Sequence, residues 1–260
     1  MSSRKRVGRR LQVGLAAGLM ALAPLAHAAS ASVAISNVTV QVIDLQPGDD
    51  VWPWAVFFTE ADWVAKTTSA LAHVELPDVS SAQQGWLGTV QSAQASSGGS
   101  FALAATSAGD LWSTGPGASA SVSVVGDQLG WASATVFNGL FLAGAQTRIV
   151  VTASVDTLSA TGSDAQANAS IELCDSDGTC HPAGYSEALV FGFPASGYAP
   201  ATTLRAEWDF SADGWGTMNA GVSASAVSAV PEPSSAVLLL AGLTAGVLAC
   251  GGLHARRRQR

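Results

Sequence analysis

Basic residues are almost absent from the middle of this 260-residue chain. Between Ser30 and Val230 only Lys66, Arg148 and Arg205 are basic, against 18 acidic residues, which gives a formal net charge of −15. Nine of the twelve basic residues of the whole chain lie outside this region. So acidic a surface excludes nucleic-acid binding by phosphate neutralisation. It favours high solubility, with attraction of cations as the alternative.

Catalytic motifs are missing as well. The chain has no nucleophile-elbow, zinc-protease, phosphate-loop or dinucleotide-binding string. The middle region holds two histidines, His73 and His181, neither of which has another histidine or a free thiol at ligand spacing. Paired carboxylates such as Glu207 and Asp209 fit a solvated strand face better than glycosidase chemistry, which needs two carboxylates flanking a sugar. The sequence therefore predicts no enzyme activity, no metal and no cofactor.

Long amphipathic helical patterns are also absent from the middle region, where apolar and polar residues alternate instead. Such alternation marks strands with one buried and one solvated face. The alternating runs are 38–43, 122–124, 165–173, 203–210 and 220–226, and 148–155 is β-branched and indicates a more fully buried strand. Clusters rich in Gly, Pro, Asp and Ser separate them. We expect residues 29–229 to form one all-β domain, an antiparallel β-sandwich or jelly roll.

The alternation also suggests how some strands connect. Two hairpins are expected, one joining 148–156 to 165–173 and the other joining 204–211 to 217–227. The segment Glu60–Val74 fits a short helix or a strand, and Ser92–Ser100 is expected to form a polar loop. The interior should consist of small residues with scattered aromatic side chains.

Only two cysteines, Cys174 and Cys180, lie in the middle region, and they bracket an Asp-x-Asp-Gly string. In an oxidising compartment such a pair is expected to form a disulfide. Asp-Gly favours a tight turn, so the bridge should close a hairpin tip. A calcium loop through Asp175 and Asp177 is the alternative, but the string lacks the other ligands of an EF-hand.

All eight tryptophans of the chain lie in the middle region. Trp52 and Trp54 flank a proline in an Asp-rich segment, and Trp215 lies in a glycine-rich turn, whereas Trp208 alternates with apolar residues and is expected in the core. Aromatic side chains on loops can stack on sugar rings. Trp52, Trp54 and Trp215 are therefore candidate glycan-binding residues, and filling an alanine-rich core is the alternative role. Exposure to water would favour binding.

The first 28 residues have the three parts of a secretory signal peptide. A basic stretch (residues 4–10) precedes the apolar run Leu11–Ala23, and Ala26 and Ala28 form an A-x-A cleavage site. Signal peptidase is expected to cleave after Ala28. General secretion is the expected route, and the Arg9-Arg10 pair leaves the twin-arginine route as the alternative.

The last 31 residues also have three parts in a fixed order. These are Val230, Pro231, Glu232 and Pro233; the uncharged run Ala236–Leu253; and Arg256, Arg257, Arg258 and Arg260. About 18 apolar residues approach the lower limit for a membrane-spanning helix. The arginines should remain cytoplasmic by the positive-inside rule. The prolines hold the Pro-Glu-Pro segment extended at the outer surface.

This tail, residues 230–260, resembles the PEP-CTERM sorting domain of Gram-negative bacteria. The resemblance implies recognition by exosortase, a membrane cysteine transpeptidase, and removal of the tail near the Pro-Glu-Pro motif. It further implies an inner-membrane-anchored precursor and then a product in the cell envelope, on the cell surface or in the extracellular matrix, often in bacteria that make exopolysaccharide. An ordinary C-terminal membrane anchor is the alternative.

The sequence thus predicts an exported, exosortase-processed envelope or matrix protein with a structural role and no catalysis. The second hypothesis is a carbohydrate-binding module for exopolysaccharide that uses Trp52, Trp54 and Trp215. A glycoside hydrolase or lyase is a third hypothesis. The expected partners are the secretion machinery, signal peptidase, exosortase and, for the second hypothesis, exopolysaccharide.

Overall fold

The structure, a computed structural model, describes residues 28–58, 68–75, 78–162, 164–192 and 202–228. These residues form strands, turns and loops with no helix, and Ala28–Ser228 forms one compact unit. The prediction of an all-β fold is confirmed. The strands are β1 (Ala29–Asp44), β2 (Ala55–Phe57), β3 (Thr68–Val74), β4 (Val79–Gly85), β5 (Ser92–Ser97), β6 (Ser100–Thr106), β7 (Ala118–Val124), β8 (Gln128–Ala143), β9 (Thr147–Thr161), β10 (Gln166–Asp175), β11 (Cys180–Phe191), β12 (Thr203–Phe210) and β13 (Gly214–Ser228).

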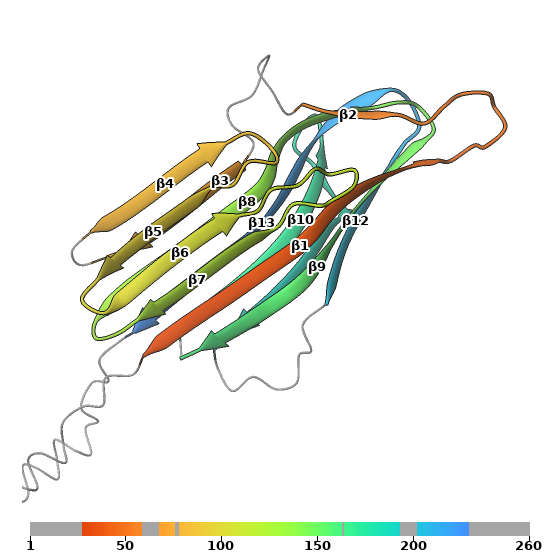
Figure 1. Cartoon of the computed structure of the whole chain (residues 1–260). Coiled ribbons are helices and arrows are strands. Elements are labelled where there is room, and N and C mark those ends of the chain that lie inside the picture. Colours follow the sequence, from red (N-terminus) through yellow and green to blue (C-terminus); the bar gives the residue numbers. More distant parts are fainter. Residues whose placement is uncertain (1–27, 59–67, 76–77, 163, 193–201, 229–260) are drawn as a thin grey trace, which may run out of the picture. The chain divides into compact units, whose positions relative to one another are not determined.

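The strands form two antiparallel sheets that face each other as a β-sandwich. Sheet A has the order β12-β9-β1-β7-β6-β5. Sheet B has the order β11-β10-β13-β8-β3-β4, and the short β2 pairs with the C-terminal end of β8, residues 141–143. Figure 1 shows β5, β6, β7, β1 and β9 side by side in one layer, with β8, β13 and β10 behind them. The coarse prediction of an antiparallel sandwich is therefore confirmed.

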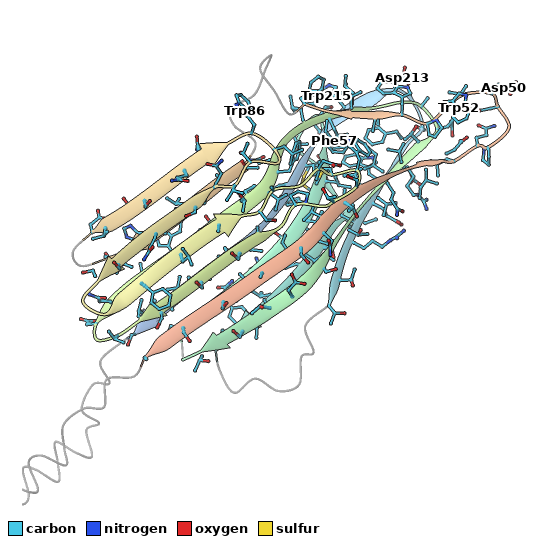
Figure 2. All side chains as sticks on the ribbon, in the orientation of Figure 1. Asp50, Trp52, Phe57, Trp86, Asp213 and Trp215 are labelled. Atoms are coloured by element: carbon cyan, nitrogen blue, oxygen red, sulfur yellow. A yellow bond between two sulfur atoms is a disulfide. The ribbon has the colours of Figure 1, made fainter. Side chains whose placement is uncertain are left out.

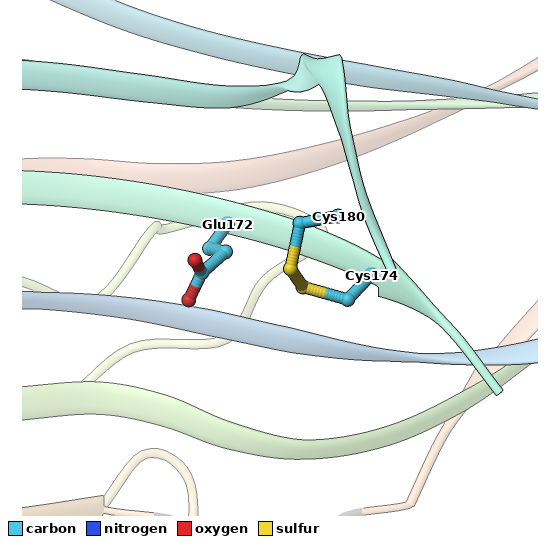
Figure 3. A group of neighbouring side chains, drawn as sticks. All are labelled: Glu172, Cys174 and Cys180. Atoms are coloured by element: carbon cyan, nitrogen blue, oxygen red, sulfur yellow. A yellow bond between two sulfur atoms is a disulfide. The ribbon is translucent and has the colours of Figure 1, made fainter. Parts of the chain in front are cut away.

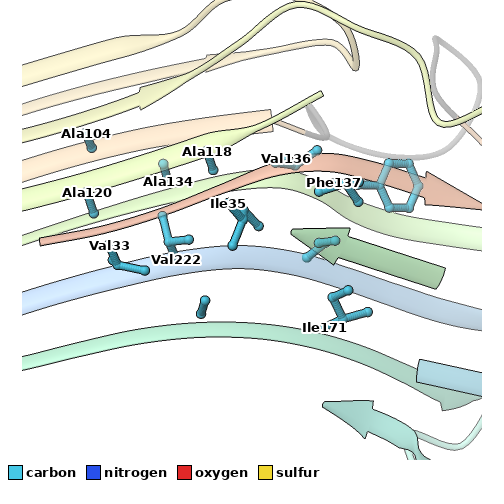
Figure 4. Close-up of a cluster of buried hydrophobic side chains, with 14 of the residues drawn as sticks. Val33, Ile35, Ala104, Ala118, Ala120, Ala134, Val136, Phe137, Ile171 and Val222 are labelled. Atoms are coloured by element: carbon cyan, nitrogen blue, oxygen red, sulfur yellow. The ribbon is translucent and has the colours of Figure 1, made fainter. Parts of the chain in front are cut away.

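The core between the sheets is built mainly from alanine and valine, as the alternation predicts. Ala104, Ala120 and Ala134 are at most 1% exposed, and larger side chains such as Phe137 and Ile171 fill the remaining space (Figure 4). Small inward side chains let the two sheets approach closely. The large aromatic residues of the core are phenylalanines, because every tryptophan among the described residues is at least partly exposed.

In the long strand β1, the residues that face the core change from odd-numbered to even-numbered about halfway along. Odd-numbered residues up to Ile35 face the core, and even-numbered residues from Val38 onward do so. The pairing of β1 with β9 shifts between Ser36 and Thr39, and Asn37 has a positive φ of 53°. This β-bulge inserts one extra residue and so exchanges the two faces of the strand. Both apolar runs of β1 can therefore reach the same core.

Both predicted hairpins are wrong, although their strands exist. β9 belongs to sheet A and β10 to sheet B, and β12 and β13 are divided in the same way. Each turn therefore carries the chain across the core from one sheet to the other. Alternation fixes which face of a strand is buried, but two buried faces can meet across a core as well as lie side by side in one sheet.

One other local prediction needs correction, and one alternative that the sequence left open is decided in part. Ser92–Ser100 is not a loop, because β5 and the start of β6 form a hairpin there, with Ala93 and Ala95 buried and the turn at Gly98 and Gly99. Ser92 and Ser96 occupy outward positions that tolerate polar side chains, and the buried Ser100 accepts a hydrogen bond from the Val125 N–H. In Glu60–Val74, the part from Thr68 onward is strand β3, and residues 60–67 lie outside the described residues.

The two ends of the sandwich carry different parts of the chain, the chain ends at one and long loops at the other. Ala29 pairs with Val124 and Ser228 with Gln128, on the two sides of the short β7–β8 connection. Both ends of the described chain therefore lie at this end, which we term the proximal end. The opposite, distal end carries the loops 45–54, 107–117, 144–146 and 211–213. The 15 residues of β13 separate the two ends by roughly 50 Å, at about 3.4 Å per residue.

Candidate functional site

Three adjacent strands of sheet B carry outward-facing apolar side chains at the distal end, exposed on β2 and β13 and half-buried on β8. Val56 of β2 and Trp215 of β13 both pair with Leu142 of β8, which places the three in one row. The row faces outward because the flanking residues Ala143 and Gly216 face the core. Val56 is 49% exposed and Trp215 is 46% exposed. The strand pairing itself thus forms an apolar surface open to water.

Trp54 extends this surface by covering a glycine. A side-chain carbon at Gly144 would clash with the Trp54 indole, so the ring lies directly over the glycine. The Gly144 N–H also donates to the Trp54 carbonyl oxygen at 3.0 Å. The indole is held against the backbone yet remains 42% exposed. We term Trp54, Val56, Leu142 and Trp215 the aromatic platform.

Trp52 lies two residues before Trp54 on the 45–54 loop and is 86% exposed. The loop is ordered locally, since the Val51 N–H donates to Asp49 Oδ1 at 2.9 Å and Asp50 has a positive φ of 60°. Figure 2 places Asp50, Trp52, Asp213 and Trp215 at the same end of the molecule. The three tryptophans chosen from the sequence therefore share the distal end, and all of them meet water.

An aromatic cluster supports the platform from inside. Phe57, next to Val56, is buried and stacks on Phe141 with ring centroids 5.3 Å apart. It meets Phe137 and Trp112 edge to face at 5.7 and 5.6 Å. Such pairs add stability beyond the area they bury. The rigid inner cluster therefore fixes β2 and the outward side chains next to it.

Trp112 is an aromatic residue of the distal end that the sequence reasoning did not select. It is 53% exposed and lies on the 107–117 loop. Asp110 orders this loop, because its Oδ1 accepts the N–H groups of Trp112 and Ser113 at 2.7 and 2.8 Å. Hydrogen bonds from Ser113 and Trp112 lower the pKa of the Asp110 carboxyl. The Asp-Leu-Trp-Ser string, followed by Gly-Pro-Gly, was the available signal for an ordered loop tryptophan.

Hydrogen bonds and an ion pair also connect the remaining distal loops. The Ala145 N–H donates to Asp213 Oδ1 at 2.7 Å, and the Leu45 N–H donates to the Gln146 carbonyl oxygen at 2.8 Å. Arg148 donates to Asp209 through Nη2 at 2.7 Å, and this hydrogen bond holds the pKa of the Asp209 carboxyl below its usual value. The loops around the platform therefore form one connected frame.

The acidic pair Glu207 and Asp209 lies on β12 in contact with arginines. Arg205 contacts Glu207 at 2.7 Å, and Arg148 contacts Asp209. Both carboxylates thus belong to ion pairs on the outer part of sheet A. They do not converge on the aromatic platform, which agrees with the solvated strand face expected from the sequence.

The disulfide between Cys174 and Cys180 is confirmed, and it closes the tip of the β10–β11 hairpin. Glu172 lies close to the two sulfur atoms (Figure 3). Both sulfurs are committed to the bridge, so this group offers a metal ion one carboxylate and no thiolate. The disulfide therefore acts as a structural cross-link of the β10–β11 hairpin.

Asp175 and Asp177 make the hydrogen bonds of a tight turn. Asp175 Oδ1 accepts the N–H groups of Asp177 and Thr179, both at 3.1 Å, and Asp177 Oδ1 accepts the Thr179 N–H at 2.9 Å. The contacts with Asp175 and Thr179 lower the pKa of Asp177 to about 2. These contacts agree with the expected turn and place both carboxylates in its hydrogen-bond network.

The sorting and processing residues fall outside the described part of the chain. These are Ala26, the apolar run 236–253, Val230, Pro231, Glu232, Pro233, Arg256, Arg257, Arg258 and Arg260. Of the signal cleavage site, only Ala28 is described, and it is exposed just before β1. Within the described residues, no helix is long and apolar enough to cross a membrane.

Comparisons with known proteins found no relative of this chain. No protein-family model, no curated protein and no solved structure matches the chain. The functional argument therefore rests on the residues of this protein.

Proposed function

We propose that this is an exported, exosortase-processed protein of the cell envelope or extracellular matrix, with a structural role and no catalysis. Its β-sandwich binds polysaccharide through the aromatic platform and Trp52. The exposure of Trp52, Trp54 and Trp215 at one end of the domain carries the binding part of this proposal. The sorting part rests on the signal-peptide pattern, the PEP-CTERM-like tail, and helices expected in 11–23 and 236–253.

Stacking is the physical basis of the binding. An indole ring offers a flat apolar face and one N–H donor, which suits the apolar faces and hydroxyl groups of a sugar ring. Large exposed apolar patches on soluble domains commonly mark binding surfaces. Trp54 lies over Gly144 and Trp215 belongs to a regular strand, so both rings are positioned before a ligand arrives. Preorganised side chains lose little entropy on binding.

The negative charge of the domain determines which class of polysaccharide is expected to bind. Residues between Ser30 and Val230 have a formal net charge of −15, and Asp50 and Asp213 lie near the exposed tryptophans. An anionic polymer would be repelled by this field. A neutral polymer would contact aromatic faces together with carboxylates that can accept hydrogen bonds from its hydroxyl groups. The expected ligand class is therefore a neutral polysaccharide.

The platform lies at the end of the domain away from Ser228, after which the sorting tail begins in the sequence. A domain tethered through its proximal end would therefore keep the distal aromatic residues available. This arrangement suits a protein that joins the cell surface to an extracellular polymer.

Binding is tested by electrophoresis of the exported protein through gels that contain soluble hydroxyethyl cellulose, a neutral glucan, or alginate, an acidic polymer. We expect retardation in the neutral gel only. The double variant Trp54→Ala/Trp215→Ala should lose at least tenfold in affinity, since truncating a tryptophan at the centre of a binding surface typically costs about 2 kcal/mol or more. The host's own exopolysaccharide is tested in the same way.

The matched control is Trp86→Ala, which removes a tryptophan that is 37% exposed and outside the platform. This variant should bind as the unchanged protein does. Equal affinity of the double variant, or no retardation in any neutral polymer including the host's own, would refute polysaccharide binding by the platform.

Processing is tested by the intact mass of the protein from the native host's envelope and medium. A chain that begins at Ala29 and ends between Pro231 and Pro233 is expected, with any surplus mass reporting an attached group. Changing Pro231, Glu232 and Pro233 together to alanine should leave the tail in place. A product that keeps residues 234–260 in the unchanged protein would instead indicate an ordinary membrane anchor.

A further inference from the structure

The outer face of sheet A near the proximal end is a flat array of uncharged side chains. Five neighbouring strands contribute three residues each, in continuous register. We term this array the sheet A face. Its residues are Thr157, Ser159 and Thr161 of β9; Ser30, Ser32 and Ala34 of β1; Ser119, Ser121 and Ser123 of β7; Phe101, Leu103 and Ala105 of β6; and Ser92, Gln94 and Ser96 of β5.

The sheet A face differs from the rest of the domain in charge and in apolar exposure. None of its side chains is ionisable, although the region between Ser30 and Val230 carries a net charge of −15. Phe101 and Leu103 are 43% and 40% exposed. Two large apolar side chains thus stand in water on a face that carries no charge itself. The net charge of each copy opposes association at long range, and salt at physiological strength screens this repulsion.

The arrangement of large and small side chains is self-complementary. Phe101 and Leu103 lie on β6, on one side of the central strand β7, whereas Ser30, Ser32 and Ala34 lie on β1, on its other side. A two-fold axis parallel to β7 would place β6 of one copy over β1 of the other. In that arrangement Leu103 meets the partner copy at the row of the small Ser32. Closed two-fold interfaces have this property, in which one patch matches itself.

The area of the sheet A face sets the strength of the contact. Strands spaced about 4.8 Å apart and residues two apart at about 6.8 Å give a footprint of roughly 500 Å² per copy. The total of roughly 1,000 Å² lies at the lower limit for specific interfaces. The contact should therefore be weak in dilute solution and form at the high local concentration of a surface layer.

One backbone donor on each of the edge strands β5 and β12 of sheet A is already bonded within the domain. On edge strand β5, the Ser92 N–H donates to Gln83 Oε1 of β4 at 3.0 Å. On edge strand β12, the Arg205 N–H donates to Ser186 Oγ of β11 at 3.0 Å. Each donor is occupied by a side chain of the other sheet and is less available to an incoming strand.

We propose that the sheet A face binds a second copy of this chain, face to face, about a two-fold axis along β7. This inference is independent of polysaccharide binding, because the platform lies on sheet B at the other end of the domain. Its consequence is a dimer with two distal ends, each carrying a platform. Such a dimer would join two polymer chains and so serve a structural role in a matrix.

The test is sedimentation velocity of the chain from Ala28 to Ser228, which forms one compact unit with its own core, over a hundredfold range of concentration. We expect the weight-average mass to rise from that of a monomer toward that of a dimer. Leu103→Asp should keep the protein monomeric throughout. The matched control Phe191→Asp changes a side chain that is 51% exposed on the opposite sheet, and it should dimerise as the unchanged protein does.

A rescue variant tests the axis. Because Leu103 of one copy lies opposite Ser32 of the other, Leu103→Asp combined with Ser32→Lys should restore the dimer. A mass that stays monomeric for the unchanged protein overturns the proposal, as does equal dimerisation by Leu103→Asp. Reduced polymer retention by Leu103→Asp without any change in mass would assign the face to polysaccharide instead and would also overturn it.

Discussion

Replacing Phe141 with alanine is expected to lower the free energy of unfolding by about 3–5 kcal/mol. Phe141 is 0% exposed, and its ring stacks on Phe57 at 5.3 Å and meets Phe210 edge to face at 5.7 Å. Removal of the ring leaves a cavity among aromatic neighbours, which cannot collapse fully. Domains of this kind have a total stability of about 5–15 kcal/mol, so the loss is a large share.

Urea unfolding followed by tryptophan fluorescence measures this change. Phe101→Ala is the matched control, because Phe101 is a strand phenylalanine that is 43% exposed. At a concentration where the protein is monomeric, the control should change stability by no more than about 0.5 kcal/mol. A loss below about 1.5 kcal/mol for Phe141→Ala would mean that the distal aromatic cluster does not stabilise the fold as its geometry implies.

Replacing Gly115 with alanine is expected to cost about 2–5 kcal/mol. Gly115 has a φ of +21°, and a side-chain carbon there would lie 2.6 Å from the Asn37 Cα atom. Positive φ costs a non-glycine residue about 1–2 kcal/mol, and overpacking against backbone adds roughly 1–3 kcal/mol. The 107–117 loop would have to leave the β1 bulge, where the Val38 N–H donates to the Pro116 carbonyl oxygen at 3.1 Å.

Gly126→Ala separates the two causes. Gly126 also has a positive φ, of 72°, but no atom lies within 4 Å of an added side-chain carbon. This control should cost about 1 kcal/mol, from the backbone conformation alone. Equal losses for the two variants, measured by urea unfolding, would show that the loop does not press on the bulge. A larger loss for Gly115→Ala should also change the fluorescence of Trp112, which lies on the same loop.

Most strands could be predicted because the solvent imposes their pattern. A strand of a two-layer sandwich has one wet and one dry face, so β10 and β13 alternate along the sequence. The disulfide hairpin was predictable for a local reason, since Cys174 and Cys180 are six residues apart with Asp-Gly between them. The loop prediction for Ser92–Ser100 failed because serine is common both in turns and on wet strand faces.

The candidate site was only partly predictable. Trp52, Trp54 and Trp215 were selected because turn residues surround them, and the structure places all three at the distal end. Val56 and Leu142 were not selected, because neither belongs to a run whose alternation would show which face of a strand it occupies. The bulge around Val136, where the pairing of β8 with β13 shifts, reverses the phase of β8 and turns Leu142 outward.

The exposure of Trp208 also depends on its tertiary surroundings and not only on the alternation of its strand. Its alternation with Leu204 and Phe210 predicted a core residue, but it is only partly buried and stacks on Phe210 with centroids 5.5 Å apart. In β12, Leu204 and Phe210 are buried, with Glu207 and Trp208 both partly exposed between them. A side chain at the margin of a core can therefore follow the core pattern without being enclosed.

The sequence by itself determined the all-β class, the acidic charge, the disulfide and the faces of most strands, because each depends on local chemistry or on the period of one strand. Only the tertiary structure decided which strands are neighbours. β9 and β10 are adjacent in sequence yet lie in different sheets, because burying two apolar faces against each other across a core satisfies both at once. The aromatic platform arises from the same cause, since pairing places Val56, Leu142 and Trp215 in one row.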